Sequence, residues 1–473
     1  MKTVRSGLRR GTSGPLRWGA VTDRKQWIER DRAVVWHGFT QMASFADNNP
    51  VLVERAEGRE LIDVDGRRYL DAISSLWVTT LGHRVPELDA AAAGQLGKVA
   101  HSTLLGNGNT TTVEFAEALA GVVPVDGPHF LFASDGAAAV EQAIKIAFQY
   151  WTNQGVQGRT KYLAFGGAYH GDTIGSLSIG AGGFGTDVFD PLRFPVVRAP
   201  GFDDPACIER ACELIAAHRH ELAAVVVAPL VQGAAGMQLR PAEEFAALGE
   251  ACRRHDVLLV CDEVATGFGR TGTMFAVEQC GLRPDLMTIG KGITGGYLAL
   301  AATVANDRVY EAFLGEDLSE RTLYHGHSYS GNALAAAVGL AHLELFTGSG
   351  VLDNVRERAA QLDALLSERI APLEQVAQVR QQGLMVGVEL APPPGGPPPQ
   401  VLRWGRRVCA GAVDRGVLLR PLGDVVVLMP ILTSTSEEIE RIVDVLEASI
   451  LDLDADSPAR GDQSGGDQSG ERV

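Results

Sequence analysis

VLLVCDE, at residues 257–263, is a run of five apolar residues that ends in two acids. A second apolar run leads into a glycine and a lysine at residues 286–292, which read LMTIGKG. Both runs have the length and composition of buried strands. Further strands are expected at 129–133 and 224–228, and amphipathic helices such as 241–255 alternate with them. This alternation predicts an α/β fold in which helices cover both faces of a mainly parallel sheet.

Asp262 and Lys291 each stand where one of these predicted strands ends. An open α/β sheet binds its ligand outside the carboxyl ends of its strands, so an acid and an amine can meet there over one small molecule. Pyridoxal phosphate needs such a pair, because its ring nitrogen stays protonated beside a carboxylate and its aldehyde condenses with a lysine. A buried salt bridge or two unrelated charges would be the structural alternative. Three glycines within six positions, at 267, 269 and 272, favour a backbone pressed against a cofactor.

Composition limits the class of protein. The chain has 473 residues, 45% of them apolar, and a formal net charge of −16, which argues against a nucleic-acid partner. No apolar stretch approaches the roughly 20 residues that span a bilayer, so no membrane association is expected. The six cysteines are dispersed without metal-ligand spacing, which fits a reducing cytoplasm and predicts no metal site.

The two ends of the chain differ in composition from the rest. Residues 1–25 are expected to form a disordered basic extension, although an organellar transit peptide would share their composition, and residues 451–473 to form a disordered polar tail. Residues 434–437, Ser-Thr-Ser-Glu, resemble a capping box that opens a helix of a smaller domain. The predicted order is an N-terminal segment of the small domain at 26–80, a large cofactor-binding domain at 81–345 and the rest of the small domain at 346–450.

A predicted strand, a glycine turn and a helix follow one another around Gly136 and Ala137. The free backbone N–H groups at a helix N-terminus, together with the helix dipole, make a site for an anion such as a phosphate. An ordinary strand-to-helix turn has the same pattern. The phosphate interpretation gains weight because the cofactor inferred from Asp262 and Lys291 carries a phosphate.

Three further motifs have two interpretations each. Tyr169, in a loop of small residues, can stack on a flat cofactor or form a surface pair with its neighbouring histidine. The histidines of the segment 325–332 suggest a metal site by residue type alone, but they lack metal-ligand spacing and therefore predict a polar loop. Arg420 ends an apolar run, so its guanidinium can hold a substrate carboxylate or pair with Asp424.

Residues 262–272, Lys291 and the Gly136 turn resemble the class III, fold-type I aminotransferases that depend on pyridoxal 5'-phosphate, over about residues 30–450. Within that family, the chain resembles the branch that converts 8-amino-7-oxononanoate to 7,8-diaminononanoate in biotin formation. Segments that carry this second resemblance are 36–42, 74–77, 169–173, 231–237, 262–270 and 420–423. The resemblance implies a large domain with a mainly parallel seven-stranded sheet, a smaller α+β domain and a homodimer with a shared active site.

The same resemblance implies roles for single residues. Lys291 would hold the cofactor through an imine, Asp262 would pair with its ring nitrogen, and Tyr169 would stack on the ring. Gly136 and Ala137 would bind the phosphate through backbone N–H groups. The remaining implied contacts are Ser328 to the phosphate from the second subunit, Arg420 to the substrate carboxylate, and Phe39, Trp77, Arg270 and Gly326 around the substrate.

Departures from the family pattern bear on the phosphate site and on the amino donor. Ala137 stands where many relatives have serine, which removes one hydroxyl contact to the phosphate. Phe39 and the pair His327-Ser328 resemble members that take the amino group from lysine, so lysine and S-adenosylmethionine both remain candidate donors.

The alternatives to this function are another class III omega-amino acid or diamine aminotransferase and a non-catalytic cofactor-binding protein. A nicotinamide enzyme is disfavoured, since no G-x-G-x-x-G follows the first strand.

Overall fold

The computed structural model describes residues 23–182, 185–391, 395–397 and 399–455. Contacts divide the chain into a first unit, residues 1–56 with 61–68, and a second unit, residues 57–60 with 69–473. Most of the predicted basic extension and polar tail lies outside the described residues. Helices extend a few residues into both predicted segments, because α1 begins at Arg24 and α15 continues to Ala455.

The first unit is small and built from short elements. It contains α1 (Arg24–Val34), the 3-10 turns η1 (Met42–Ser44) and η2 (Ala46–Asn48), and most of β1 (Val53–Glu57) and β2 (Glu60–Asp63). Asp23 caps α1 by accepting a hydrogen bond from the backbone of Lys25. His37 bonds to Asp31 at 2.7 Å and stacks on Phe45 with ring centroids 4.5 Å apart, which orders the segment that follows the helix.

A seven-stranded sheet forms the centre of the second unit, in the order β4-β12-β11-β10-β7-β5-β6. Every pairing in it is parallel except those of β12 with β11 and β4. The predicted mainly parallel seven-stranded sheet is confirmed. Its strands are β4 (His129–Ala133), β5 (Lys161–Phe165), β6 (Val197–Ala199), β7 (Leu222–Val227), β10 (Leu258–Asp262), β11 (Leu286–Ile289) and β12 (Ala301–Ala305).

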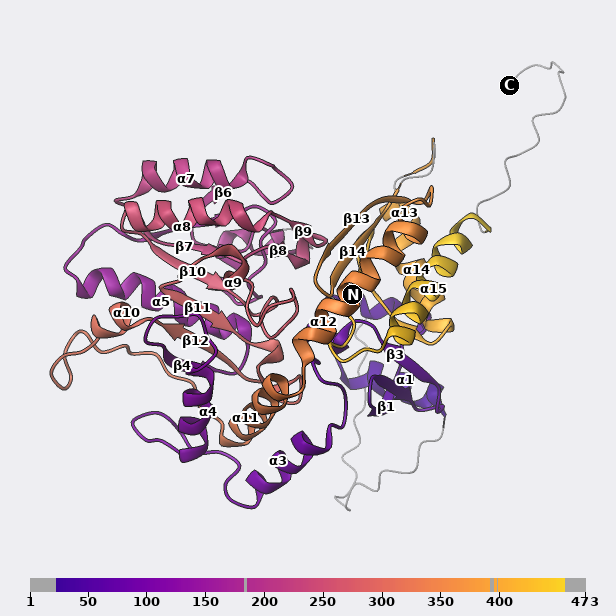
Figure 1. The fold of residues 1–473 in the computed structure, drawn as a ribbon, viewed down its shortest axis with the longest axis horizontal. Helices are drawn as coiled ribbons and strands as arrows, with labels where there is room; N and C mark the ends of the chain where they lie inside the picture. The colour runs from indigo at the N-terminus through magenta and orange to yellow at the C-terminus, as the bar shows by residue number, and fades with distance from the viewer. Residues whose placement is uncertain (1–22, 183–184, 392–394, 398, 456–473) are drawn as a thin grey trace, which may run out of the picture. The chain divides into compact units, whose positions relative to one another are not determined.

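Helices cover both faces of this sheet, as the sequence predicts. α5 (Gly136–Asn153) lies on one face, and α7 (Cys207–His218) and α8 (Phe245–Arg254) lie side by side on the other (Figure 1). Successive residues of β7 divide between the two layers: Val225 packs in the cluster that contains α7 and α8, and Val226 in the cluster that contains α5. Because both faces of β7 are buried, this strand is continuously apolar and does not alternate.

The helix α11 (Ala333–Gly348) supports the segment that carries the predicted lysine. It packs against α3 (Pro86–Leu96), α4 (Thr110–Ala120) and the 3-10 turn η6 (Lys291–Thr294). His342 of α11 is fully buried and bonds to Thr80 at 2.7 Å. Among the described residues no single helix could cross a membrane by length and composition; α11 with the helical segment 351–370 passes that test jointly but is bent by 66°.

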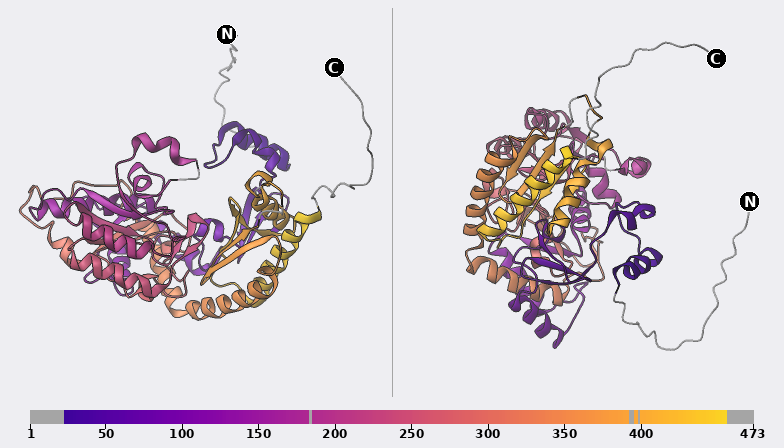
Figure 2. Two further views of the ribbon diagram at one scale, coloured as in Figure 1. Left: turned by 90° about the horizontal axis from the view of Figure 1, so that it is seen from above. Right: turned by 90° about the vertical axis from the view of Figure 1, so that its right-hand side faces the viewer.

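A second sheet, in the order β13-β14-β17-β16, and the helices α12, α13 (Pro399–Leu402), α14 and α15 make up most of the C-terminal part. α14 and α15 pack side by side (Figure 2), and α12 also contacts α15. The elements are α12 (Val351–Leu365), β13 (Val376–Gln382), β14 (Met385–Leu390), α14 (Trp404–Asp414), β15 (Val417–Leu418), β16 (Arg420–Leu422), β17 (Val425–Leu428) and α15 (Ser436–Ala455).

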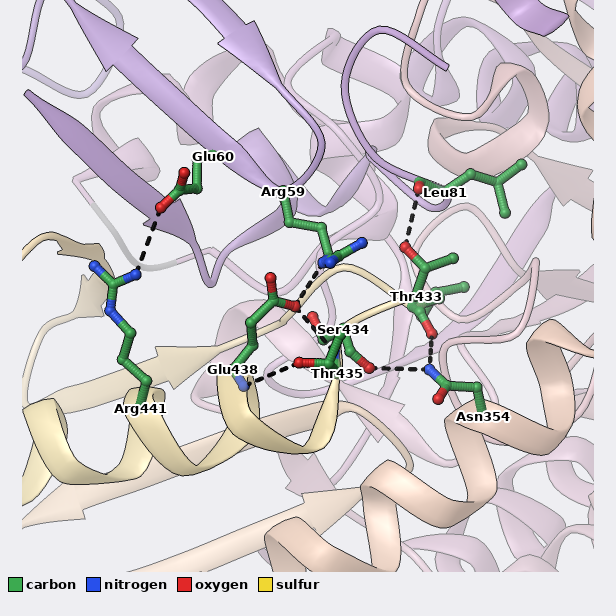
Figure 3. A network of polar contacts seen from close by, with 10 residues as sticks. Arg59, Glu60, Leu81, Asn354, Thr433, Ser434, Thr435, Glu438 and Arg441 are labelled. Atoms are coloured by element: carbon green, nitrogen blue, oxygen red, sulfur yellow. Dashed lines mark hydrogen bonds and ion pairs between the residues drawn. The ribbon is translucent and has the colours of Figure 1, made fainter. Parts of the chain in front are cut away.

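The capping box of α15 lies one residue later than the sequence predicts. Thr435 Oγ1 accepts from the N–H of Glu438 at 3.3 Å, and the Glu438 carboxylate accepts from the N–H of Thr435 at 2.9 Å (Figure 3). Ser434 is part of the preceding turn, where its N–H bonds to Ile431 and its carbonyl accepts from Asn354. The same Glu438 oxygen also accepts from Arg59 at 2.5 Å, so this cap anchors the β1–β2 turn to α15.

Candidate functional site

A cavity of about 700 Å³ opens at one edge of the seven-stranded sheet. Its walls come from the segments that follow β4, β5, β7, β10 and β11, and from the segment 296–300 that precedes the antiparallel β12. All of these chain segments meet at the carboxyl edge of the parallel strands, where ligands bind in this class of sheet. Asp262 and Lys291 both line this cavity, as the spacing of their strands predicts.

Asp262 is held in one orientation by three hydrogen bonds. One carboxylate oxygen accepts from His170 Nδ1 at 2.6 Å, and the other accepts from Thr288 Oγ1 at 2.9 Å and from the N–H of Val264 at 3.0 Å. Burial alone raises the pKa of this carboxyl, but the contact with His170 and the other donors outweighs it, so the pKa of Asp262 lies below its usual value. The residue is therefore a fixed negative charge.

His170 is the functional contact that the sequence reasoning missed. The sequence interpretation treated it as a neighbour of Tyr169, whereas its side chain is fully buried against Asp262. Because a carboxylate only accepts hydrogen bonds, the 2.6 Å contact fixes the proton on Nδ1. His170 follows β5, which lies two strands from β10 in the sheet. Segments that follow parallel strands meet at the same edge of the sheet, and this rule could have revealed the contact between His170 and Asp262.

The acid next to Asp262 is in a different electrostatic state. Glu263 is completely buried and points away from the cavity lining, where its carboxylate accepts from Thr266 Oγ1 and from the N–H of Val277. Burial raises the pKa of Glu263 to about 7, and these hydrogen bonds oppose that rise only in part. Of the two adjacent acids, only Asp262 presents a permanent charge to the cavity.

Lys291 is the second residue after β11 and begins η6 with a left-handed φ of 44°. Burial lowers the pKa of its amine to about 8, although the nearby Asp262 charge opposes the shift. Its Nζ lies 4.8 Å from the centroid of the Trp77 ring, within the range of a cation–π contact. A lysine of this kind supplies an appreciable fraction of neutral, nucleophilic amine near physiological pH.

The rate at which the cofactor-depleted protein binds pyridoxal phosphate covalently is expected to rise with pH and to level off above about pH 8. The neutral amine is the reactive form, and its fraction increases as pH passes through a pKa of about 8. An ordinary lysine, with a pKa of about 10.4, would keep accelerating for roughly two further pH units. Stopped-flow absorbance across this range distinguishes the two, and continued acceleration to pH 10 would contradict the shifted pKa.

The N-terminus of the 18-residue helix α5 opens into the same cavity, at the turn where the sequence predicts an anion site. Asp135 caps the helix through the N–H of Ala138, and no described residue accepts a hydrogen bond from the N–H groups of Gly136 and Ala137. A Cβ added to Gly136 would lie 2.6 Å from Val264, so only glycine fits this close approach. Free N–H groups, a fixed carboxylate and a buried amine in one cavity fit the phosphate, ring nitrogen and aldehyde of pyridoxal phosphate.

Tyr169 lines the same cavity and is 40% exposed. Its hydroxyl donates to Asp172 at 2.8 Å. Burial and this hydrogen bond raise the pKa of the phenol, which therefore stays protonated at all physiological pH values. The hydrogen bond to Asp172 holds the hydroxyl of Tyr169 in place. The face of its aromatic ring stays available to a flat ligand in the cavity.

Trp77 forms another wall, on a backbone with unusual torsion angles. Ser74, Ser75 and Trp77 have φ values of 50°, 61° and 65°, a left-handed conformation that is costly for residues with side chains. The buried Asp71 carboxylate accepts from the N–H of Ser75 at 2.8 Å and helps to hold this segment. The ring also presses on Gly233, where a Cβ would approach it to 3.1 Å.

Arg270, which the family resemblance places around the substrate, lies behind the cavity wall and is not part of the cavity lining. It is 2% exposed, and its guanidinium donates to Ser74 Oγ at 2.7 Å and to the carbonyls of Thr79 and Pro430 at 2.8 and 2.5 Å. Both terminal nitrogens of Arg270 are thus engaged behind the wall that carries Trp77, whereas its buried Nε has no partner among the described residues. The structure places Arg270 as a support for the cavity rather than as a surface of it.

The other predicted site residues lie away from the cavity lining. Arg420 is half-buried and its backbone pairs with Val427 in the second sheet, but its guanidinium makes no hydrogen bond or ion pair with a described residue, so pairing with Asp424 is not observed. Gly326 and Ser328 lie in an exposed loop, where the Ser328 carbonyl accepts from His101 at 2.8 Å. Phe39 belongs to the first unit and is 67% exposed. Among the described residues no group of His, Cys, Asp and Glu could hold a metal ion.

Comparisons with known proteins agree with this geometry. The family model for class III aminotransferases matches residues 42–450. An adenosylmethionine-8-amino-7-oxononanoate aminotransferase of Nitratidesulfovibrio vulgaris is 45% identical over 89% of this chain and 81% of its own length. The crystal structure of such an aminotransferase from Methanocaldococcus jannaschii has a TM-score of 0.88 and 38% identity over 91% of this chain and 99% of that one. An amine transaminase from an uncultivated Pseudomonas species, in its PLP-bound form, has a TM-score of 0.81 and 32% identity over 88% of this chain and 98% of that one.

Proposed function

Because the chain belongs to the class III aminotransferases, which are enzymes that depend on pyridoxal 5'-phosphate, we propose that it transfers an amino group to 8-amino-7-oxononanoate. The product is 7,8-diaminononanoate, an intermediate of biotin biosynthesis. The observation that carries the proposal is a near full-length relative named for this reaction, 45% identical, combined with a cavity that contains the required carboxylate and amine.

The chain's own residues supply binding and proton transfer. When bound, pyridoxal phosphate provides the electron sink for transamination. We assign to the Asp262 carboxylate the task of keeping the ring nitrogen protonated, and to the Lys291 amine the transfer of a proton between the substrate carbon and the cofactor. Tyr169 would cover one ring face, and the N–H groups of Gly136 and Ala137 would hold the phosphate. A donor amine gives up its amino group first, and the ketone of 8-amino-7-oxononanoate then receives it.

Arg420 is the proposed ligand of the substrate carboxylate. Its guanidinium has no described partner, and it lies near enough to Tyr169 to lower the pKa of that phenol in part. Two parallel hydrogen bonds from an arginine match a carboxylate in geometry and charge. The apolar chain of the substrate would then extend along the wall that contains Leu76 and Trp77.

Replacing Arg420 with alanine is expected to raise the KM for 8-amino-7-oxononanoate about 10-fold to 100-fold, because hydrogen bonds to charged groups contribute roughly 1.5–3 kcal/mol. The value of kcat should change little, since the carboxylate is bound equally in ground and transition states. Steady-state kinetics with Arg415→Ala as control tests this, because Arg415 pairs with Asp452 outside the site. An unchanged KM would remove Arg420 from the substrate site.

We also propose an oligomeric state and a cellular location for the enzyme. A homodimer that shares its active site would bring Ser328 and Gly326 of a second copy to the cofactor, which the exposure of both residues in the single chain supports. Phe39 would contribute to the substrate pocket in that assembly. A cytoplasmic enzyme fits the six cysteines, none of which forms a disulfide in the described residues.

The direct test offers S-adenosylmethionine and lysine separately to the purified enzyme, follows the absorbance of the bound cofactor, and then adds 8-amino-7-oxononanoate. The donor is the compound that changes the absorbance, and mass spectrometry should then detect 7,8-diaminononanoate. Formation of no diamine with either donor, together with turnover of simple omega-amines, would instead favour a class III omega-aminotransferase.

A further inference from the structure

Glu141 lies in the second turn of α5, five positions after Gly136, and its side chain reaches the loop that carries Tyr169. One carboxylate oxygen accepts three hydrogen bonds, from Thr173 Oγ1 at 2.6 Å and from the N–H groups of Gly175 and Ser176 at 2.7 and 3.2 Å. These groups form the N-terminus of the short helix α6 (Ile174–Ile179). Thr173, at the N-cap position, makes no side-chain cap of its own, so Glu141 takes over that task from another helix.

Close contacts make this connection specific. A Cβ added to Gly175 would lie 2.2 Å from a Glu141 oxygen, so the carboxylate sits directly on the backbone of the loop. Four residues earlier in the chain, a Cβ added to Gly171 would lie 2.4 Å from Ala137. The loop therefore rests on α5 at two points, beside the phosphate site and at Glu141.

The loop that makes these contacts carries two groups of the cofactor site, immediately before Gly171. Tyr169 lines the cavity, and His170 bonds to Asp262 at 2.6 Å. The phosphate site, the aromatic face and the fixed carboxylate are thus connected through one segment. We propose that Glu141 is a positioning residue for the cofactor ring: by holding residues 173–176 on α5, it fixes the distance of Tyr169 and His170 from the phosphate site. The proposal concerns the cofactor, so it does not depend on the identity of the substrate.

The test compares binding of pyridoxal phosphate with binding of inorganic phosphate to cofactor-depleted, full-length protein. Glu141→Ala should weaken binding of pyridoxal phosphate about 10-fold to 100-fold, as expected for lost hydrogen bonds to a charged group, and leave binding of phosphate unchanged. The induced circular dichroism of the bound cofactor should also decrease at saturation. Gln149→Ala is the matched control, because this α5 residue bonds to the backbone of a different loop, at Arg321 and Thr322.

A second pair of variants tests the same contact from the other side. Gly175→Ala should reproduce the effect, since the new methyl group displaces the carboxylate, and Glu141→Ala/Gly175→Ala should be no worse than either single variant. Glu141→Gln retains an acceptor oxygen and should recover part of the affinity. Equal weakening of phosphate and pyridoxal phosphate binding would show a general role in the stability of α5 and overturn the proposal, as would unchanged affinity and circular dichroism in both single variants.

Discussion

Lys291→Ala is expected to lower kcat for transamination by at least about 10³-fold, because the enzyme loses both its covalent attachment to the cofactor and its proton-transfer group. Among the described residues that line the cavity, Lys291 is the only lysine, so no other amine is in place to substitute for it. The variant should bind pyridoxal phosphate non-covalently through the α5 site and Asp262 and should lack the absorbance band of the lysine-bound cofactor.

Lys161→Ala provides the matched control for Lys291→Ala. Lys161 begins β5 at the opposite edge of the same sheet and pairs with Glu221 at 2.6 Å. Its replacement should leave both turnover and the absorbance band unchanged. Retained turnover in Lys291→Ala, with an unaltered absorbance band, would refute the assignment of the catalytic amine.

The second large effect is expected for Asp262→Asn, which should lower kcat roughly 10²-fold to 10³-fold, the range found when one preorganised electrostatic contact is removed. An amide cannot keep the ring nitrogen protonated by charge, and it leaves the buried His170 without its carboxylate partner. The absorbance of bound cofactor should persist, because Lys291 is intact. Turnover and spectra together separate this variant from Lys291→Ala.

Asp285→Asn is the appropriate comparison for Asp262→Asn. Asp285 precedes β11 at the amino edge of the sheet, where it accepts a hydrogen bond from the N–H of Leu259 at 2.9 Å. Its substitution affects a sheet-end hydrogen bond and leaves the cavity untouched. A similar loss of kcat in both variants would mean that Asp262 acts through folding and not through the cofactor.

Much of the fold could be predicted because its determinants are local. The apolar runs that become β10 and β11 are buried on both faces, and the residues that follow them must lie at one edge of a parallel sheet. That reasoning placed Asp262 and Lys291 in one cavity. The end of a predicted helix and the register of its cap depend on single hydrogen bonds, so the cap of α15 was predicted one residue too early.

The remaining parts of the site depend on contacts between distant segments. His170 and Asp262 are 92 positions apart, and Arg270 and Ser74 are 196 apart. Only the order of strands in the sheet, and the path of the chain behind Trp77, bring these pairs together. The predicted roles of Phe39, Gly326 and Ser328 require a second copy of the chain and remain predictions.

The antiparallel strand β12 has a consequence for how this enzyme acquires new reactions. Since β12 runs opposite to its neighbours, the chain crosses from Lys291 to β12 through one short segment, and residues 296–300 of that segment form part of the cavity wall. The amine and carboxylate are anchored at buried strand ends, whereas this wall is a connection without regular structure. Evolution or design can therefore reshape the chamber for a different amine by altering the connection, while the reactive centre is inherited intact.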